Sequence, residues 1–211
     1  GVQTCALPIC EKRLSYGIAH NMGTRLSADG VPVDADAFAA GMRDAIAGNE
    51  PLMTQEEIIA EMQTFQQAQT ERMQAESNAA ATRNAEEGEK FLTENAAREG
   101  VVSLDSGLQY EILEAGTGAT PTSTDTVEVH YRGTLINGTE FDSSYKRGQT
   151  VNFGVTQVIA GWTEALQLMK VGAKWRLFIP SDLAYGPGGA GQLIGPNATL
   201  LFDVELVSIA E

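Results

Sequence analysis

The side chains best suited to nucleophilic or metal chemistry are scarce in this sequence. It contains 211 residues, of which two are cysteines and two are histidines. Cys5 and Cys10 lie close together at the start, whereas His20 and His130 are far apart. Neither a G-x-S-x-G nor an H-E-x-x-H motif accompanies the histidines, so no nucleophile–base pair and no zinc motif is indicated. A reaction carried out by this chain is therefore expected to need no nucleophile, metal ion or cofactor.

Composition and charge exclude two further classes of protein. The net charge is −14 and the pI is about 4.5. Such a surface repels phosphate backbones, so we expect no nucleic-acid partner. No stretch approaches the roughly 20 apolar residues that a membrane-spanning helix needs, so we expect no transmembrane segment.

Residues 1–10 have an unusual composition for the start of a domain. Cys10 follows Leu7-Pro8-Ile9, which raises the possibility of a lipid-attachment cysteine. However, Ile9 is bulky where a small residue is needed, and the preceding stretch is too short for the apolar core of a signal peptide. We interpret residues 1–10 as a non-native or truncated start and exclude them from the fold prediction.

The spacing of apolar side chains predicts two short helices in the first part of the chain. Leu14, Ile18, Met22 and Leu26 recur every four residues and predict a helix over residues 11–28. A second apolar stripe follows Asp34, which is a typical N-cap residue, and ends at Gly48.

A long helix is predicted to follow these two. Thr54 and Glu57 have the spacing of a capping box, and the helix-forming composition continues to about residue 100. Residues 74–98 contain few large apolar groups, so this half is expected to bury little and to bridge two domains through solvent. Gly88 is expected to weaken the helix by about 1 kcal/mol relative to alanine and to mark a bend. The alternative for this half is a disordered linker.

The predicted helical arm offers only a thin hydrophobic core. A unit of roughly 60 residues is marginally stable alone. We therefore expect residues 11–53 to form a helical dimerisation domain, with the homodimer interface extending over residues 11–73. The alternative is a small self-contained helical domain.

The pattern changes after Gly100 to alternating apolar and polar residues. Such alternation predicts strands near residues 108–112, 126–135, 151–153, 173–179 and 198–209. Asn137-Gly138 is a strong tight-turn signal, residues 142–148 are predicted to be a polar loop, and one short helix is expected over residues 162–169. The predicted fold class is α+β: an antiparallel sheet wrapped on one short helix over residues 101–211, preceded by an all-α arm and the connecting helix of residues 54–100.

Five segments in the second half carry a specific resemblance. They come in the order and at the spacings of the FKBP family: Val129–Gly133, Gly138–Ser144, Val158–Trp162, Leu183–Gly186 and Asn197–Leu206. The chain thus resembles FKBP-type peptidyl-prolyl cis–trans isomerases. Together with the helical arm, it is similar to the bacterial Mip-like subgroup, in which the arm forms a homodimer.

The resemblance implies a prolyl-binding slot without cofactor or metal. It places these residues around the slot: Tyr131, Phe141, Phe153, Val158, Ile159, Trp162, Tyr185 and Phe202. By the same resemblance, Trp162 forms the floor, the Ile159 backbone N–H and the Tyr185 hydroxyl hold substrate carbonyls, and Asp142 orients polar groups at the rim. Leu193 and Ile194 are lid candidates in a glycine-rich loop, and macrolide inhibitors are possible ligands. His130 alternates with Tyr131 along the strand, so its side chain should point to the other face, and we expect a structural or solvent-facing role for it. The alternative for Phe202 is that it belongs only to the hydrophobic core.

Two functions follow from these patterns. The first is an isomerase that accelerates X–Pro rotation during protein folding, with an added chaperone role. The second is a dimeric folding chaperone or scaffold in which isomerase activity is incidental or vestigial. The subgroup occurs in more than one compartment, and we expect a periplasmic or outer-membrane-associated location rather than a cytoplasmic one.

Overall fold

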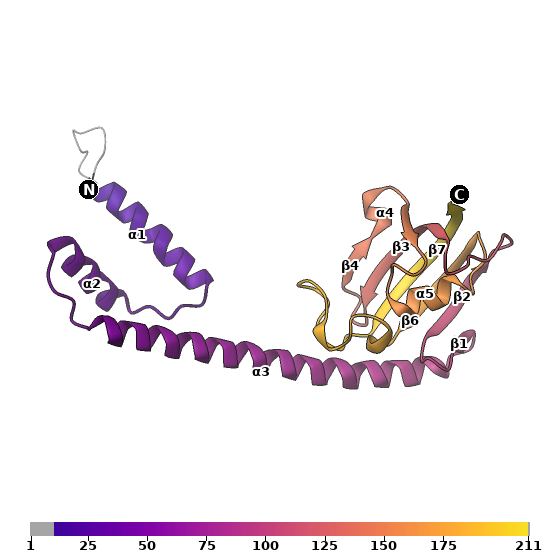
Figure 1. Cartoon of the computed structure of the whole chain (residues 1–211), viewed down its shortest axis with the longest axis horizontal. Coiled ribbons are helices and arrows are strands. Elements are labelled where there is room, and N and C mark those ends of the chain that lie inside the picture. The colour runs from indigo at the N-terminus through magenta and orange to yellow at the C-terminus, as the bar shows by residue number, and fades with distance from the viewer. Residues whose placement is uncertain (1–10, 211) are drawn as a thin grey trace. The chain divides into compact units, whose positions relative to one another are not determined.

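The structure is a computed structural model and describes residues 11–210 (Figure 1). The chain divides into two compact units at Gln66, which lies inside a helix, and each unit is treated separately below. No helix in the described part of the chain is long and apolar enough to cross a membrane. The interpretation of residues 1–10 falls outside the described residues.

The first unit contains the two predicted short helices and the beginning of the long one. These are α1 (Glu11–Ala28), α2 (Ala35–Ala47) and α3 (Gln55–Ala96). Asp34 caps α2 by accepting a hydrogen bond from the Ala37 N–H at 2.8 Å, and Gly48 ends it with a φ of 71°. Both predicted helix ends are therefore confirmed.

No residue of α1 or α2 is buried. The apolar stripes of these helices stand largely in solvent, with Ile46 80% exposed and Leu14 and Ile18 each 53% exposed. The described part of the first unit thus lacks a hydrophobic core of its own.

Helix α3 begins at the predicted capping box. The Thr54 N–H donates to the Glu57 carboxylate at 2.8 Å, and the Glu57 N–H donates to the Thr54 hydroxyl at 3.2 Å. The helix then runs without interruption past Gly88. The alternative of a disordered linker is wrong, because residues 74–96 all belong to this helix.

The second half of α3 packs against the C-terminal domain, contrary to the expectation that it crosses solvent. Gly88 and Asn95 are buried, and the Phe91 ring lies 6.0 Å from the Phe178 ring. A Cβ atom on Gly88 would lie only 2.4 Å from the Thr199 hydroxyl oxygen. Small residues on this face bring the helix backbone close to the domain, so contact does not require the large apolar groups whose absence led to the wrong prediction.

The second unit is built on one antiparallel sheet, with the strand order β1-β2-β6-β7-β3-β4 and β5 paired with β3. The predicted α+β class is confirmed. The strands are β1 (Val101–Ser103), β2 (Gln109–Ala115), β3 (Thr126–Leu135), β4 (Glu140–Ser143), β5 (Val151–Gly154), β6 (Ala173–Ile179) and β7 (Leu200–Ala210). The helices are α4 (Ser144–Arg147) and α5 (Ala160–Leu166), with single 3-10 turns η1 (Ser181–Leu183) and η2 (Gly186–Gly188).

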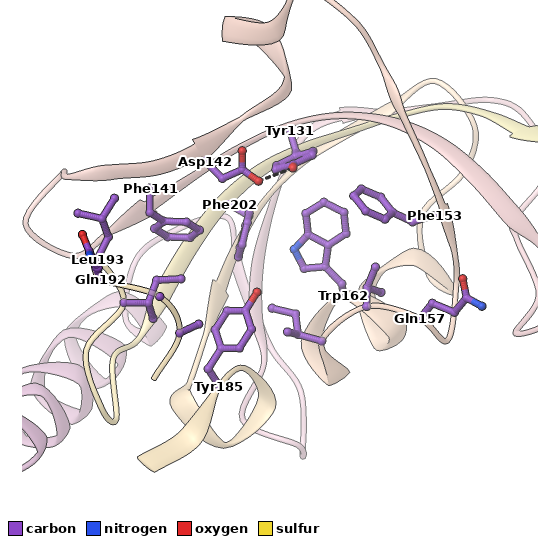
Figure 2. Close-up of a pocket in the computed structure, with 15 residues that line it drawn as sticks. Tyr131, Phe141, Asp142, Phe153, Gln157, Trp162, Tyr185, Gln192, Leu193 and Phe202 are labelled. Atoms are coloured by element: carbon purple, nitrogen blue, oxygen red, sulfur yellow. Dashed lines mark hydrogen bonds between the residues drawn. The ribbon is translucent and has the colours of Figure 1, made fainter. Parts of the chain in front are cut away.

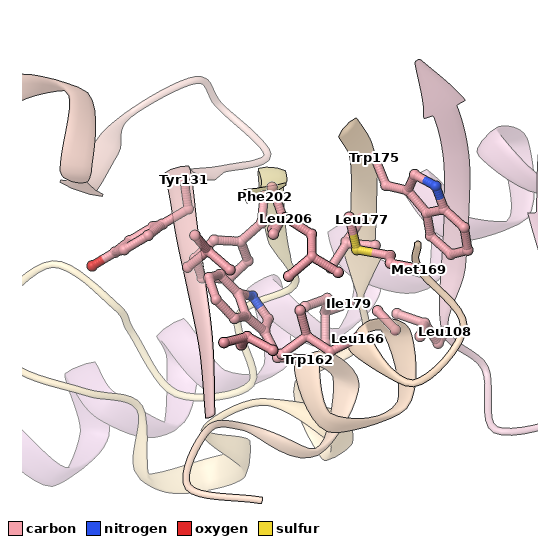
Figure 3. Close-up of a cluster of buried hydrophobic side chains, with 14 of the residues drawn as sticks. Leu108, Tyr131, Trp162, Leu166, Met169, Trp175, Leu177, Ile179, Phe202 and Leu206 are labelled. Atoms are coloured by element: carbon pink, nitrogen blue, oxygen red, sulfur yellow. The ribbon is translucent and has the colours of Figure 1, made fainter. Parts of the chain in front are cut away.

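The core of this domain lies between α5 and one face of the sheet (Figure 3). Trp162 and Leu166 of α5 pack against buried residues of the central strands, among them Leu177, Ile179 and Leu206. Alternation along β3 buries Val127, Val129 and Tyr131 on the same side. The sheet and α5 therefore hold the aromatic residues at one end of this core in fixed positions.

Two local predictions need correction. Residues 142–148 are not all loop. Strand β4, which was not predicted, includes Asp142 and Ser143. Ser143 then caps the one-turn helix α4 by accepting a hydrogen bond from the Lys146 N–H, and Gly148 ends it with a φ of 69°. Helix α5 ends at Leu166 rather than at Met169. Short strand β1 was not predicted, since three residues give too little alternation to detect.

Candidate active site

A pocket of about 670 Å³ opens at one end of the sheet (Figure 2). Such a volume lies within the roughly 300–1,000 Å³ of pockets that hold small ligands. All eleven residues that the sequence places at the slot and its lid line this pocket: Tyr131, Phe141, Asp142, Phe153, Val158, Ile159, Trp162, Tyr185, Leu193, Ile194 and Phe202. Gln157, Ala190, Gly191 and Gln192 also line it and were not predicted.

Strand pairing brings the walls of the pocket together. Gly133 of β3 pairs with Asp142 of β4 on one side and with Phe202 of β7 on the other. A Cβ atom on Gly133 would lie 2.6 Å from the Phe141 ring and 2.7 Å from the Phe202 ring. The glycine therefore leaves the space in which these two rings meet edge to face, with centroids 5.4 Å apart.

Trp162 is the centre of the aromatic cluster. Its ring is nearly perpendicular to the rings of Tyr131, Phe153 and Phe202, at centroid distances of 5.3, 5.8 and 5.2 Å. Edge-to-face contacts of this kind add stability beyond the burial of area and fix each ring. The Trp162 indole nitrogen is buried and has no hydrogen-bond partner among the described residues. Apart from this N–H group, the floor of the pocket is a rigid, apolar surface of aromatic rings.

A charged network closes one side of the rim. The Tyr131 hydroxyl donates to the Asp142 carboxylate at 2.5 Å, and Arg147 both ion-pairs with Asp142 and donates to the Tyr131 oxygen at 2.7 Å. Burial alone would raise the pKa of Asp142, but the hydrogen bonds from Tyr131 and Arg147 outweigh it and hold that pKa below its usual value. Burial, together with the bond to Asp142, raises the pKa of Tyr131. The network thus keeps Asp142 ionised and Tyr131 protonated at neutral pH.

Sequence reasoning missed Arg147. It stands at the end of α4, five residues after Asp142, inside the segment predicted to be a polar loop. The signals available were the Ser143 cap and the Gly148 terminator, which together predict a helical turn that folds Arg147 back toward Asp142. A lone arginine in a polar segment otherwise gives no sign of its partner.

Besides the Trp162 indole nitrogen, the Tyr185 hydroxyl and the Ile159 backbone N–H at the pocket have no partner in the described part of the chain. The Tyr185 hydroxyl forms no hydrogen bond there, and Figure 2 shows it directed toward the middle of the pocket. The Ile159 backbone N–H also donates to no described group, because Ile159 is the N-cap of α5 and only its carbonyl is used. Both groups are available to a ligand.

The loop that carries the lid candidates folds into a small hairpin. Ala190 and Ile194 exchange backbone hydrogen bonds of 2.8 and 3.2 Å, which places Leu193 in the loop between them. Ile194 is 8% exposed, whereas Leu193 is 54% exposed. Ile194 therefore belongs to the wall of the pocket, and Leu193 stands at its edge.

His130 lies outside the pocket, in agreement with the alternation argument. Its Nδ1 atom is 2.9 Å from the Ser144 hydroxyl, and its ring stacks on Tyr145 at 4.7 Å. The Ser144 oxygen also accepts a hydrogen bond from the Tyr131 N–H at 2.8 Å, so His130 supports the backbone behind the site. Within residues 11–210 no group of three or more His, Cys, Asp or Glu side chains could hold a metal ion.

Comparisons with known proteins agree with this geometry. Residues 118–207 match the family model of FKBP-type peptidyl-prolyl cis-trans isomerases, and residues 11–112 match the model of the domain amino-terminal to it. The outer membrane protein MIP of Legionella longbeachae is 46% identical over 197 residues, covering 93% of this chain and 84% of that protein.

A second relative and a solved structure also match almost the whole chain. The peptidyl-prolyl cis-trans isomerase Mip of Coxiella burnetii is 44% identical over 199 residues, covering 94% of this chain and 86% of the relative. The crystal structure of FkpA from Escherichia coli matches with a TM-score of 0.80 and 36% identity, covering 97% of this chain and 98% of that one. The chain belongs to the FKBP-type peptidyl-prolyl cis–trans isomerases.

Proposed function

We propose that the pocket binds the prolyl segment of a polypeptide and accelerates X–Pro rotation by desolvation and a few hydrogen bonds. The observation that carries this proposal is the combination of a rigid apolar floor at Trp162 with two unpartnered groups, the Tyr185 hydroxyl and the Ile159 N–H. Rotation breaks amide resonance against a barrier of about 18–20 kcal/mol. The twisted amide separates less charge than the planar one, so a dry apolar pocket favours it relative to water.

Each residue then has a distinct role. Trp162 is the floor under the pyrrolidine ring; the walls are Tyr131, Phe141, Phe153, Val158 and Phe202. The Ile159 N–H and the Tyr185 hydroxyl donate to substrate carbonyls. Arg147 neutralises Asp142, so that Asp142 orients the Tyr131 hydroxyl without leaving an unpaired charge beside the apolar slot. Ile194 completes the wall, and Leu193 at the edge of the pocket covers the bound segment.

The test is the cis-to-trans exchange rate of a short X–Pro peptide, with and without a macrolide FKBP inhibitor. We expect Tyr185→Phe to lower kcat/KM about three- to tenfold, because it removes one hydrogen bond of roughly 0.5–1.5 kcal/mol and keeps the ring. Asp142→Ala should cost at least as much, because it leaves Arg147 and Tyr131 without their partner.

The matched control is Tyr110→Phe, which also removes one hydroxyl but lies in β2, stacked on Trp175 and away from the pocket. It should leave the rate unchanged. If the intact protein accelerates exchange but Tyr185→Phe and Asp142→Ala behave like the control, the proposed site is wrong. If the intact, folded protein gives no acceleration, the vestigial-isomerase alternative takes its place.

We also propose that residues 11–73 form a homodimer. The support is the absence of any buried residue in α1 and α2, together with exposed apolar residues continuing into α3 at Met62 and Met73. A second copy would remove this surface from water. Sedimentation should show a dimer for the intact chain and a monomer for Ile18→Asp, with Thr24→Asp on the same helix as the control. A monomeric intact chain would contradict this interface.

The same arm supports a chaperone role as a second function. Its methionines offer an adaptable apolar surface for non-native chains. Suppression of client aggregation should need the arm, whereas prolyl turnover should not. Because one relative is named an outer membrane protein, we further propose a periplasmic or outer-membrane-associated location. Fractionation of cells that make the native full-length protein tests that location.

A further inference from the structure

A second hollow lies beside the prolyl pocket, between α3 and the ends of β3 and β7. It has a volume of about 240 Å³, and we call it the α3 groove. Ala80 and Arg83 of α3 form one wall, and Leu135 and Ala198 lie on the other side. Leu193 lines both the α3 groove and the prolyl pocket. The two hollows therefore share the edge formed by this side chain.

Two hydrogen bonds connect the walls of the α3 groove. The Asn84 side-chain amide donates to the Pro196 carbonyl at 2.8 Å, and the Asn197 amide donates to the Ala81 carbonyl at 3.4 Å. Asn197 holds a left-handed backbone with a φ of 56° to make this contact. Hydrogen bonds from both sides thus fix the loop against α3, so the groove is preformed in the way that binding sites usually are.

The groove has the size and the polarity to hold part of a peptide. Its volume is below the roughly 300–1,000 Å³ of pockets that enclose whole small molecules, and it suits one side chain of a longer ligand. Leu135, Ile136 and Ala198 offer apolar contact. Arg83 forms no ion pair with any described residue, and the Asn84 side-chain oxygen accepts no hydrogen bond from the described part of the chain. Such groups can satisfy the N–H and C=O groups of an extended backbone.

We propose that the α3 groove binds residues of the same unfolded polypeptide whose X–Pro bond lies in the prolyl pocket. The shared side chain Leu193 supports this occupant, because a chain leaving the prolyl pocket over Leu193 enters the groove directly. Helix α3 is then part of the substrate-binding surface, and substrates longer than the prolyl segment bind more tightly. The inference rests on the proposed role of the prolyl pocket.

The experiment compares a tetrapeptide with a longer peptide in which leucines flank the same X–Pro bond on both sides. For the intact chain we expect kcat/KM to be about tenfold higher for the longer peptide, the gain expected from burying most of one leucine side chain. Ala80→Phe fills the groove and should abolish this gain while tetrapeptide turnover stays unchanged. Ala79→Phe is the matched control, since Ala79 is exposed and does not line the groove.

The outcomes separate the two proposals. If the intact chain turns over both peptides equally, the α3 groove does not bind substrate, and this result needs no variant. If the gain survives in Ala80→Phe with normal tetrapeptide turnover, the groove is again excluded. If neither peptide is turned over, the proposed role of the prolyl pocket fails first, and the groove inference fails with it.

Discussion

Replacing Gly88 by alanine tests the contact between α3 and the C-terminal domain. In an exposed helix this change is expected to stabilise by about 1 kcal/mol. Here the added methyl group would lie 2.4 Å from the hydroxyl oxygen of Thr199, a residue that is only 4% exposed. Thr199 is β-branched and has few alternative rotamers, so the helix or the strand end must move.

The magnitude follows from two opposing contributions. Overpacking a well-filled site costs about 1–3 kcal/mol, and the helix propensity gain returns about 1 kcal/mol. We therefore expect Gly88→Ala to lower the free energy of unfolding of the domain by up to about 2 kcal/mol. In a Thr199→Ala background the obstacle is absent, so the same change should stabilise the domain by about 1 kcal/mol. The sign of the effect reverses between the two backgrounds.

The assay is urea unfolding followed by tryptophan fluorescence. The chain has two tryptophans, Trp162 and Trp175, and both are buried in the C-terminal domain, so the signal reports that domain and not the arm. The four proteins of the cycle are the intact chain, the two single variants and the double variant. If Gly88→Ala stabilises the intact chain as much as it stabilises the Thr199→Ala variant, α3 does not approach the domain closely, and the packing described above is wrong.

Three further predictions concern the same domain. Asn95→Ala should destabilise it by about 1–3 kcal/mol in the same urea assay, because Gln109 is buried and loses the hydrogen bond of 2.8 Å that it accepts from Asn95; an unchanged midpoint would contradict this. A fragment of residues 67–211 should keep the melting temperature of the domain and its turnover. A fragment of residues 101–211 should melt at a lower temperature, because Phe178, 1% exposed in the whole chain, loses its contact with Phe91. Equal melting temperatures for the two fragments would refute this contribution of α3. The folded-state pKa of Asp142 is depressed, so its stabilising interactions are present above the unfolded carboxyl pKa of about 3.9 and are lost as the pH falls through the lower folded value. Macrolide affinity measured against pH should therefore fall below about pH 4. The Asp142→Asn variant should show a flatter profile in that pH range.

Local signals in the sequence predicted most of the secondary structure. The capping box at Thr54 and Glu57 and the alternation along residues 126–135 depend on neighbours in the chain, and the structure contains both. The family resemblance predicted eleven residues at one slot and its lid, eight of them within the five segments, and the fold brings all eleven to one pocket. Such features can be predicted from the sequence because the interacting residues are close together in the chain, or because the same motif occurs throughout a family.

The packing of α3 could not be predicted in the same way. Its buried face consists largely of small or polar residues, so it carries no apolar stripe, and its fit depends on Thr199 and Pro196, more than one hundred residues further along the chain. Asn95 is buried because Gln109 satisfies its amide, which a polar residue in a helix does not reveal. Arg147 was missed for a related reason, since the partner of a long charged side chain is set by tertiary structure.

The position of β7 in the sheet has a consequence for the order of events during synthesis. β7 lies between β6 and β3, yet it follows every other strand along the chain. The helices of the arm leave the ribosome first, and the backbone hydrogen bonds within each of them join residues four apart, whereas the sheet cannot close until the residues of β7 have been made. Until then β3 and β6 lack the neighbour that joins them, and Phe202 is absent from the pocket. Until β7 has been made, a nascent chain of this protein is thus itself an incompletely folded polypeptide.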